Sequence, residues 1–340
     1  MVVTLKDVAL RAGVSRSAVS RTFTEGASVS GKMREKVLEA AEQLGYRPNA
    51  LASSLTTGTT GMVGLVSNNF HNPMFMQVFD LFTQKLQERG LKPLLVNLPE
   101  GAGAKDTIHM MQQYSVDGVV IASSTLPADF AYAFRKAGIP VVHTFARHTG
   151  NPNVHIVGID NVEAGRAAAM TLSERSYTHV GFLGGPEHAS TTEDRWKGFR
   201  DRIKRIGKMT VDVSFAEAYT FQAGRAAMQD ILAQDDRPEA FFCGDDVIAI
   251  GALSAIQDAG LNCPTDIGLL GVNNMEIAAW NNINLTTIHQ PLEEIIDATV
   301  RLVTKVMRQR GDRLAVDRPP EARLFPCHVV ERGTLRPLTT

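Results

Sequence analysis

The stretch VTLKDVALRAGVSRSAVSRTF, residues 3–23, carries two short helical patterns separated by a glycine. In the first pattern, apolar residues recur at i, i+3, i+4 and i+7 and form one helical stripe: Leu5, Val8, Ala9 and Ala12. Gly13 interrupts this stripe, and Ser15 can cap a second helix in which Val19 and Phe23 face inward. A helix, a three-residue turn containing glycine and a second helix have the spacing of a helix-turn-helix.

The outer face of the second helix favours a DNA-binding unit. It carries side chains that bond base edges and phosphates: Arg16, Ser17, Ser20 and Arg21. Thr4 with Asp7 resembles a capping box, and Ser30 can cap a third helix that ends near Leu44. Periodicity alone fits an ordinary three-helix bundle with solvated arginines equally well. Because the second helix is short and capped, however, it can enter a major groove end-on.

These residues carry a family resemblance. VTLKDVALRAGVSRSAVSRTF and VSGKMREKVLEAAEQLGYRPNALASSL look like the DNA-binding head and hinge of the lactose-repressor (LacI) family, with its T-x-x-D-V-A, A-G-V-S, V-S-R, R-x-x-V and Y-x-P-N positions. The resemblance implies that Arg16 and Ser17 read bases, that Ala18 allows close approach, and that Ser20 and Arg21 touch bases or backbone. It also implies further DNA contacts at Thr4, Leu5, Ser15, Ser30, Asn49 and Leu55. Thr24 departs from the usual Asn and puts one backbone contact in doubt.

The segment GYRPNALASSLTTGTT, residues 45–60, contains about two turns of helix that are too short to be stable alone. In the family this segment is the hinge. Asn49 matches the residue that opens the hinge, and Leu55 matches the leucine inserted between base steps in the minor groove. The resemblance therefore predicts that two hinges, one per subunit, fold against each other only on DNA.

Charge and composition agree with a DNA-binding head on a globular body. The 340 residues have a net charge of −1, but residues 1–60 hold eight Lys/Arg against five Asp/Glu, a net of +3. The remainder has 27 basic and 31 acidic residues, a net of −4, so the head is the part expected to meet a polyanion. No apolar run has the roughly 18 residues of a membrane span, and Lys6 and Asp7 lie where a signal peptide would be apolar, which predicts a cytoplasmic protein. Three widely spaced cysteines match no metal or redox motif, and no cofactor or metal is expected.

After residue 60 the sequence alternates strand and helix patterns in two series. Short apolar runs such as GMVGLVS and DGVVIAS alternate with helical stretches, which indicates parallel sheets covered by helices. The predicted fold class is α/β: a three-helix helix-turn-helix head with a hinge helix, then a two-lobed core with parallel sheets, like a periplasmic binding protein. The predicted domains are a DNA-binding head at 1–46, a hinge helix and linker at 47–60, and an effector-binding and dimerisation core at 61–340. We expect one lobe at roughly 61–158 plus 290–320, and the other at 159–289 plus 321–340.

The core also resembles the effector-binding core of the same family, through pieces that include HNPMF, GIDNVEAG, RWKGF and LTTIHQP. The resemblance implies that Arg195 bonds ligand hydroxyls or carboxylates and that Tyr219 stacks on a sugar face. It implies a ligand site at Phe70, Asn72, Phe75, Ser123, Arg147, Arg195, Tyr219, Asp245, Asn273 and Gln290.

Three departures concern the charge of this site. The usual Asn-Asp is Asp245-Asp246, the usual Gly-x-Asp-Asp ends in Asn273-Asn274, and the usual Asp-Arg is Ala146-Arg147. One carboxylate is gained and two are lost, so we expect an effector that has an anionic group or fewer hydroxyls than a hexose. Neutral drift in a plain sugar site remains an equal alternative.

No catalytic motif is present, since the sequence has no G-x-S-x-G, G-x-x-x-x-G-K-[ST] or H-E-x-x-H. The sequence predicts a homodimeric transcriptional repressor, not an enzyme, that binds a near-palindromic double-stranded operator and a sugar or sugar-acid effector. A purine or other metabolite as corepressor is the first alternative, and a solute-binding transport protein is a remote one. No contact with a membrane is expected.

Overall fold

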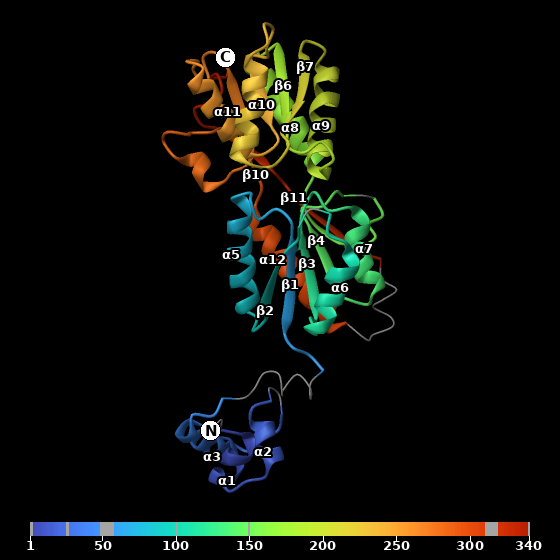
Figure 1. Ribbon diagram of the computed structural model, residues 1–340, viewed down its shortest axis with the longest axis vertical. Coiled ribbons are helices and arrows are strands. Elements are labelled where there is room, and N and C mark those ends of the chain that lie inside the picture. Colours follow the sequence, from blue (N-terminus) through green and yellow to red (C-terminus); the bar gives the residue numbers. More distant parts are fainter. Residues whose placement is uncertain are drawn as a thin grey trace. The chain divides into compact units, whose positions relative to one another are not determined.

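The computed structural model describes residues 3–24, 27–47, 58–99, 101–148, 150–309 and 319–338. The chain forms two compact units, residues 1–60 and 61–340 (Figure 1). We call the first unit the head and the second the core. None of the helices in the described part of the chain is long and apolar enough to cross a membrane.

The head consists of three helices, α1 (Leu5–Ala12), α2 (Arg16–Thr22) and α3 (Gly31–Leu44). Their apolar stripes meet in a small core formed by Val8, Ala9, Val19, Val37, Ala40 and Ala41. Gly13 has a φ of 64° at the end of α1, a left-handed conformation that glycine adopts without strain. This turn lets α2 leave at an angle to α1, so the expected helix-turn-helix is confirmed.

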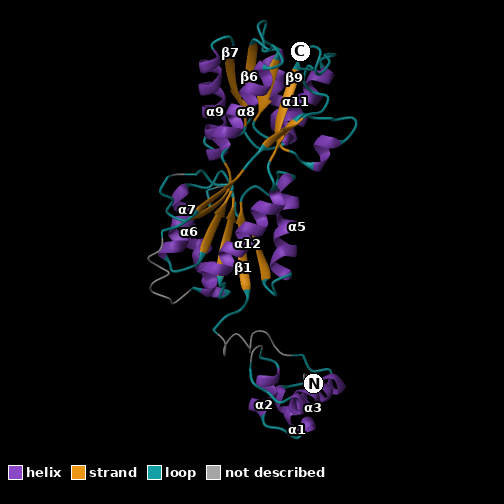
Figure 2. Cartoon of the chain, turned by 180° about the vertical axis from the view of Figure 1, so that it is seen from behind, coloured by secondary structure: helices purple, strands orange, loops and turns teal. Residues whose placement is uncertain are grey.

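The core has two lobes, each with a six-stranded sheet between two layers of helices (Figure 2). In the first lobe the strand order is β11-β5-β4-β3-β1-β2, and every pairing is parallel. Its elements are β1 (Met62–Ser67), α5 (Met74–Gln87), β2 (Lys92–Asn97), α6 (Ala104–Gln113), β3 (Gly118–Ala122), α7 (Ala128–Lys136), β4 (Val141–Thr144), β5 (His155–Ile159), α12 (Leu292–Arg308) and β11 (Ala322–Phe325). Val120 and Ala122 of β3 face the apolar layer that includes residues of α5 and α12, whereas Val119 and Ile121 face the layer that includes residues of α6 and α7. This alternation explains why the strands read as continuous apolar runs.

The second lobe repeats this arrangement with the order β12-β10-β9-β8-β6-β7, in which only β12 is antiparallel to its neighbour. Its elements are α8 (Asn161–Ser173), β6 (His179–Gly184), α9 (Ser190–Ile206), β7 (Thr210–Phe215), α10 (Phe221–Leu232), β8 (Ala240–Cys243), α11 (Asp246–Asp258), β9 (Gly268–Asn273), a 3-10 turn η1 (Glu276–Ala279), β10 (Thr287–His289) and β12 (His328–Val330). The expected α/β class with two parallel-sheet lobes is confirmed.

Helices α8 and α9 cross closely because glycines lie at their contact. A Cβ atom at Gly198 would lie 1.9 Å from the carbonyl oxygen of Val162, and one at Gly165 would lie 2.1 Å from that of Arg195. Both obstacles are backbone atoms, which cannot rotate away. The crossing therefore fixes how far the first residues of α8 lie from the first turns of α9.

The last strands differ from the expectation that residues 321–340 belong to the second lobe. Strand β11 pairs with β5 in the first lobe, from Ala322 opposite Ile156 to Phe325 opposite Ile159. Only β12 joins the second lobe. The chain therefore crosses between the lobes three times, after Ile159, after His289 and after Phe325. The third crossing was misplaced because an edge strand of either lobe has the same short apolar pattern.

Candidate functional site

The outer face of α2 displays the polar side chains expected from the sequence. Arg16, Ser17, Ser20 and Arg21 are all exposed, and no ion pair of Arg16 or Arg21 is found among the described residues. Ser15 begins the helix, because its hydroxyl accepts a hydrogen bond from the Ala18 amide at 3.1 Å. Ala18 itself is 7% exposed and so offers little surface to a partner.

The remaining predicted DNA contacts in the head lie at helix starts. The amide and the hydroxyl of Thr4 both donate to Asp7 Oδ2, at 2.8 and 2.7 Å, and these bonds lower the pKa of Asp7. Leu5 is half-buried against the head core, and Ser30 is exposed at the start of α3 without a capping hydrogen bond from its side chain. Asn49 and Leu55 lie outside the described residues.

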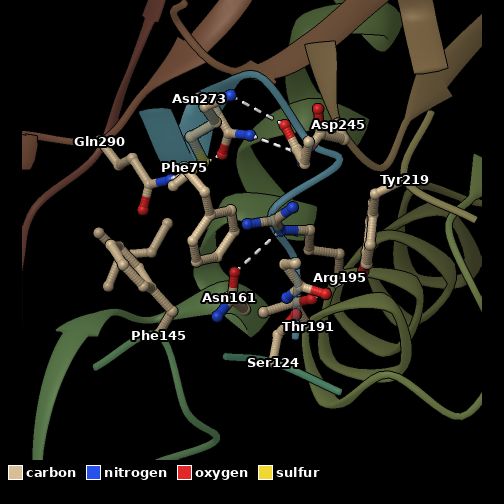
Figure 3. A pocket seen from close by; sticks show the side chains of 14 residues that line it. Phe75, Ser124, Phe145, Asn161, Thr191, Arg195, Tyr219, Asp245, Asn273 and Gln290 are labelled. Carbon is tan, nitrogen blue, oxygen red and sulfur yellow. Dashed lines mark hydrogen bonds between the residues drawn. The ribbon is translucent and has the colours of Figure 1, made fainter. Parts of the chain in front are cut away.

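A pocket lies between the lobes of the core, at the carboxyl ends of their strands, where ligands of doubly wound sheets bind. The cavity itself has a volume of about 30 Å³, and about 430 Å³ is enclosed when its open mouth is included. Figure 3 shows Asp245 and Asn273 at one end, Arg195 near the middle, Phe75 and Phe145 on one side and Tyr219 on another. The pocket is lined by Asn69, Asn72, Met74, Phe75, Ser124, Phe145, Ile159, Asn161, Thr191, Arg195, Tyr219, Asp245, Asn273 and Gln290.

Asp245 is the buried acceptor at one end of the pocket. One carboxylate oxygen, Oδ2, accepts from the side-chain amides of Asn72 (2.8 Å) and Asn273 (2.9 Å), while Oδ1 caps α11 through the Val247 amide at 2.8 Å. Burial raises the pKa of Asp245 against the lowering effect of these donors. Gln290 extends the network by donating to Asn273 Oδ1 at 2.6 Å. Asn72 belongs to the first lobe and Asp245 to the second, so this network joins the lobes inside the pocket.

Arg195 supplies the positive charge of the pocket. Its Nε donates to Asn161 Oδ1 at 2.9 Å and its Nη1 to the Gly244 carbonyl at 2.5 Å, which fixes the plane of the guanidinium. Burial lowers the pKa of Arg195 from its very high ordinary value, and the charge of Asp245 opposes this. Its Nη2 has no hydrogen-bond partner in the described part of the chain. One donor of a fixed guanidinium is thus available beside a buried carboxylate.

Aromatic rings provide the apolar walls. The rings of Phe75 and Phe145 meet edge to face with centroids 6.0 Å apart. Tyr219 lies against Gly185, where a Cβ atom would be 2.3 Å from its ring, and its hydroxyl is bonded to Thr191 (2.9 Å) and Thr192 (2.8 Å). Because its hydroxyl is occupied, Tyr219 presents mainly its ring to the pocket.

Seven of the ten predicted ligand residues come together in this pocket, and three do not. Phe70 instead stacks on Phe79 of α5, with centroids 4.4 Å apart. Ser123 is fully buried and accepts from the amides of Thr125 and Leu126, so it holds the loop after β3, and its neighbour Ser124 lines the pocket. Arg147 pairs with Glu193 and Asp194 at the rim. The resemblance gives no side-chain direction in these loops, so it does not determine which of their residues line the pocket.

Seven further residues line the pocket that were not predicted from the sequence: Asn69, Met74, Ser124, Phe145, Ile159, Asn161 and Thr191. Two of them had a usable signal. Asn161 lies in the motif GIDNVEAG at a chain crossing, and Thr191 precedes Arg195 by one helical turn and so shares its face. Phe145 depends on a φ of 67°, which no local pattern predicts.

Asp246 lies directly behind the pocket and is completely buried. It accepts from Thr287 Oγ1 at 2.5 Å and from the Met275 amide at 2.8 Å, and so ties the loop after β9 to β10. Asn273 is the last residue of β9, and Gln290 directly follows β10. Burial raises the pKa of Asp246 to about 7.

We predict a pH effect on stability from Asp246. Because its pKa is raised on folding, its contribution to stability is fully present below the unfolded pKa near 4 and is lost as the pH rises through about 7. Between pH 8 and pH 6, wild type should gain ~1–2 kcal/mol in free energy of unfolding relative to Asp246→Asn, which has no such proton to bind. Urea unfolding at pH 6, 7 and 8 measures this difference, and parallel pH curves for the two proteins would contradict it.

Comparison with known proteins identifies both units. Residues 4–49 match the model of bacterial regulatory proteins of the lacI family, and residues 169–335 match a periplasmic binding protein-like domain. The chain is 32% identical to the HTH-type transcriptional repressor PurR of Vibrio cholerae serotype O1 (strain M66-2), over 99% of each chain. A structure of the transcriptional regulator CelR with cellobiose is 27% identical, with a TM-score of 0.72, over 98% of this chain and 99% of that one.

A structure of the lac repressor dimer bound to operator and the anti-inducer ONPF has the same fold, with a TM-score of 0.86, 22% identity and coverage of 98% and 99%. The head, the two-lobed core and the full-length similarity to a repressor agree. The chain therefore belongs to the lacI family of bacterial regulatory proteins, as a DNA-binding transcriptional repressor with an effector-binding core, and it is not an enzyme.

Proposed function

We propose that this repressor acts as a homodimer whose two heads occupy adjacent major grooves of a near-palindromic operator. The exposed face of α2 supports this, because its arginines and serines are accessible to bases and phosphates. The lac repressor structure named above is a dimer on its operator. In the core, Met76 of α5 and Leu95 of β2 are 73% and 50% exposed although apolar, which supports a covered surface there.

We predict that Arg16→Ala weakens binding to an operator selected from a random duplex pool by about 5- to 150-fold and relaxes its specificity, because a base-reading arginine contributes ~1–3 kcal/mol. Fluorescence anisotropy at one fixed salt concentration measures both. Arg11→Ala is the matched control, since Arg11 is also an exposed head arginine but donates to Gln43 Oε1 at 2.8 and 3.0 Å. Equal losses in both variants would argue against reading by Arg16.

The effector we propose is a small polyhydroxylated molecule, a sugar or a sugar acid. The observation that carries this is the combination of a buried carboxylate, amide groups and a fixed guanidinium with aromatic walls. Hydroxyls can donate to Asp245 and accept from Asn273 or Arg195, while the C–H faces of a sugar ring pack on Phe75 or Tyr219. The related CelR was solved with cellobiose.

A purine is the second candidate, because the chain is 32% identical to a repressor named PurR and because flat aromatic walls also suit a planar base.

The charge of the pocket distinguishes neutral sugars from sugar acids as effectors. Arg195 and Asp245 balance each other, and Arg147 is paired outside the pocket, so a neutral sugar needs no compensating group. A sugar acid would have to place its carboxylate at Arg195 and away from Asp245.

A thermal-stability screen of neutral sugars, their uronic and aldonic acids, and purine bases tests the effector proposal. A ligand at 100 times its dissociation constant should stabilise the protein by about 2.7 kcal/mol. Stabilisation by sugars or sugar acids alone supports the proposal. Stabilisation by purine bases alone would replace it with the second candidate.

A further inference from the structure

We infer that Arg147, a residue expected to touch the effector, instead holds the two lobes together at the rim of the pocket. Arg147 lies in the loop after β4 of the first lobe. Its Nε donates to Asp194 Oδ1 at 2.9 Å and its Nη2 to Glu193 Oε2 at 2.5 Å, both on α9 of the second lobe. We call these three side chains the inter-lobe latch.

A backbone contact next to the latch closes the same gap. The Ser124 carbonyl, on the loop after β3 of the first lobe, accepts from the Ser190 amide at 3.0 Å and from the Ser190 hydroxyl at 3.1 Å. Ser190 is the first residue of α9, so its amide has no partner in its own helix. That amide is bonded only while the lobes are closed at this edge.

The latch and the pocket use different side chains of the same helical turns. Thr191 and Arg195 of α9 line the pocket, whereas Glu193 and Asp194 point to the rim. The inter-lobe hydrogen bond inside the pocket, from Asn72 to Asp245, uses an atom that a ligand would also need. The latch uses none of the polar groups that line the pocket. A ligand in the pocket therefore does not compete for the three side chains of the latch.

The strength of the latch follows from its exposure. The Arg147 and Glu193 side chains are 39% and 50% exposed, but Asp194 is only 15% exposed. A partly exposed pair of this kind changes an equilibrium by about 2- to 5-fold. High salt should weaken it, because the screening length falls to about 3 Å at 1 M.

Hydrogen exchange of the Ser190 amide in the full-length protein, without ligand, tests the latch. In Arg147→Gln we expect this amide to exchange about 2- to 5-fold faster than in wild type at low salt, with the difference lost in 1 M NaCl. The Glu193 amide, which donates to Ala189 within the second lobe, should keep its rate. In a double-mutant cycle, Arg147→Gln is combined with Glu193→Gln/Asp194→Asn. Their effects on Ser190 exchange should be non-additive, because removing the carboxylates has no further effect once the arginine is gone.

Arg166→Gln is the matched control. Arg166 is a partly exposed arginine that pairs with Glu163 at 3.0 Å, but both lie on α8 of the second lobe. We expect no change at Ser190 in this variant. The proposal would be overturned if the Ser190 amide exchanged at the wild-type rate in Arg147→Gln. It would also be overturned if Arg166→Gln accelerated this exchange equally.

Discussion

The substitution Gly198→Ala is expected to destabilise the core by ~3 kcal/mol or more and to lower its melting temperature by about 6–12 °C. The added methyl group would lie 1.9 Å from the Val162 carbonyl oxygen. Since that atom belongs to the backbone of α8, relief requires the two helices to move apart. Apolar contacts between α8 and α9 would then be lost along their length.

This separation should also reach the pocket. Asn161 begins α8 and Arg195 lies on α9, and the 2.9 Å bond between them depends on the helix spacing. Scanning calorimetry measures the melting temperature. Gly150→Ala is the control, because a Cβ atom at Gly150 meets nothing within 4 Å and its φ is not in the left-handed range. If Gly198→Ala had the same melting temperature as wild type, the two helices would be able to move apart without loss of stability.

The second large effect is expected for Asp245→Asn. This substitution should lower the affinity for the effector found by the thermal screen about 30- to 150-fold. A carboxylate accepts charge-assisted hydrogen bonds at both oxygens, whereas an amide has one oxygen for the donors of Asn72, Asn273 and Val247. Loss of a bond to a charged group costs ~2–3 kcal/mol, which corresponds to that range of affinities. Asn remains a good helix cap, so α11 itself should survive.

Isothermal titration calorimetry at constant pH measures this loss. Asp258→Asn serves as the control, because Asp258 ends the same helix and forms an exposed ion pair with Arg225 at 2.8 Å. It should bind the effector like wild type. An Asp245→Asn protein with wild-type affinity would mean that the effector does not use this end of the pocket.

The head could be predicted closely from the sequence because local signals determine it. The apolar stripe of α1, the turn at Gly13 and the cap at Ser15 lie within eleven residues of each other, and each has a conformational cause. The alternation of strands and helices in the core was equally readable. In contrast, α12 was not predicted, although Leu292, Ile295, Ile296 and Thr299 form a buried helical face. Residues 290–320 were nevertheless expected in the first lobe, and α12 covers β3 and β4 there.

Seven residues predicted from the resemblance line the pocket, and they lie both in regular elements and in loops. Arg195 on α9, and Asp245 and Asn273 at element ends, line the pocket because their elements fix the direction of their side chains. Ser123 and Arg147 lie in loops, where one residue or one rotation exchanges a pocket position for a structural one. Only the packed tertiary structure determines that choice.

The three crossings also affect how the protein can be made. Neither lobe is encoded by one continuous segment, and residues 322–330 supply an edge strand to both sheets. During translation neither sheet can be completed until these residues have left the ribosome. A product that stops at residue 320 would leave β5 and β10 as unpaired edges at once, a form that invites aggregation. Both sheets of the core can therefore be completed only in a chain that contains these last strands.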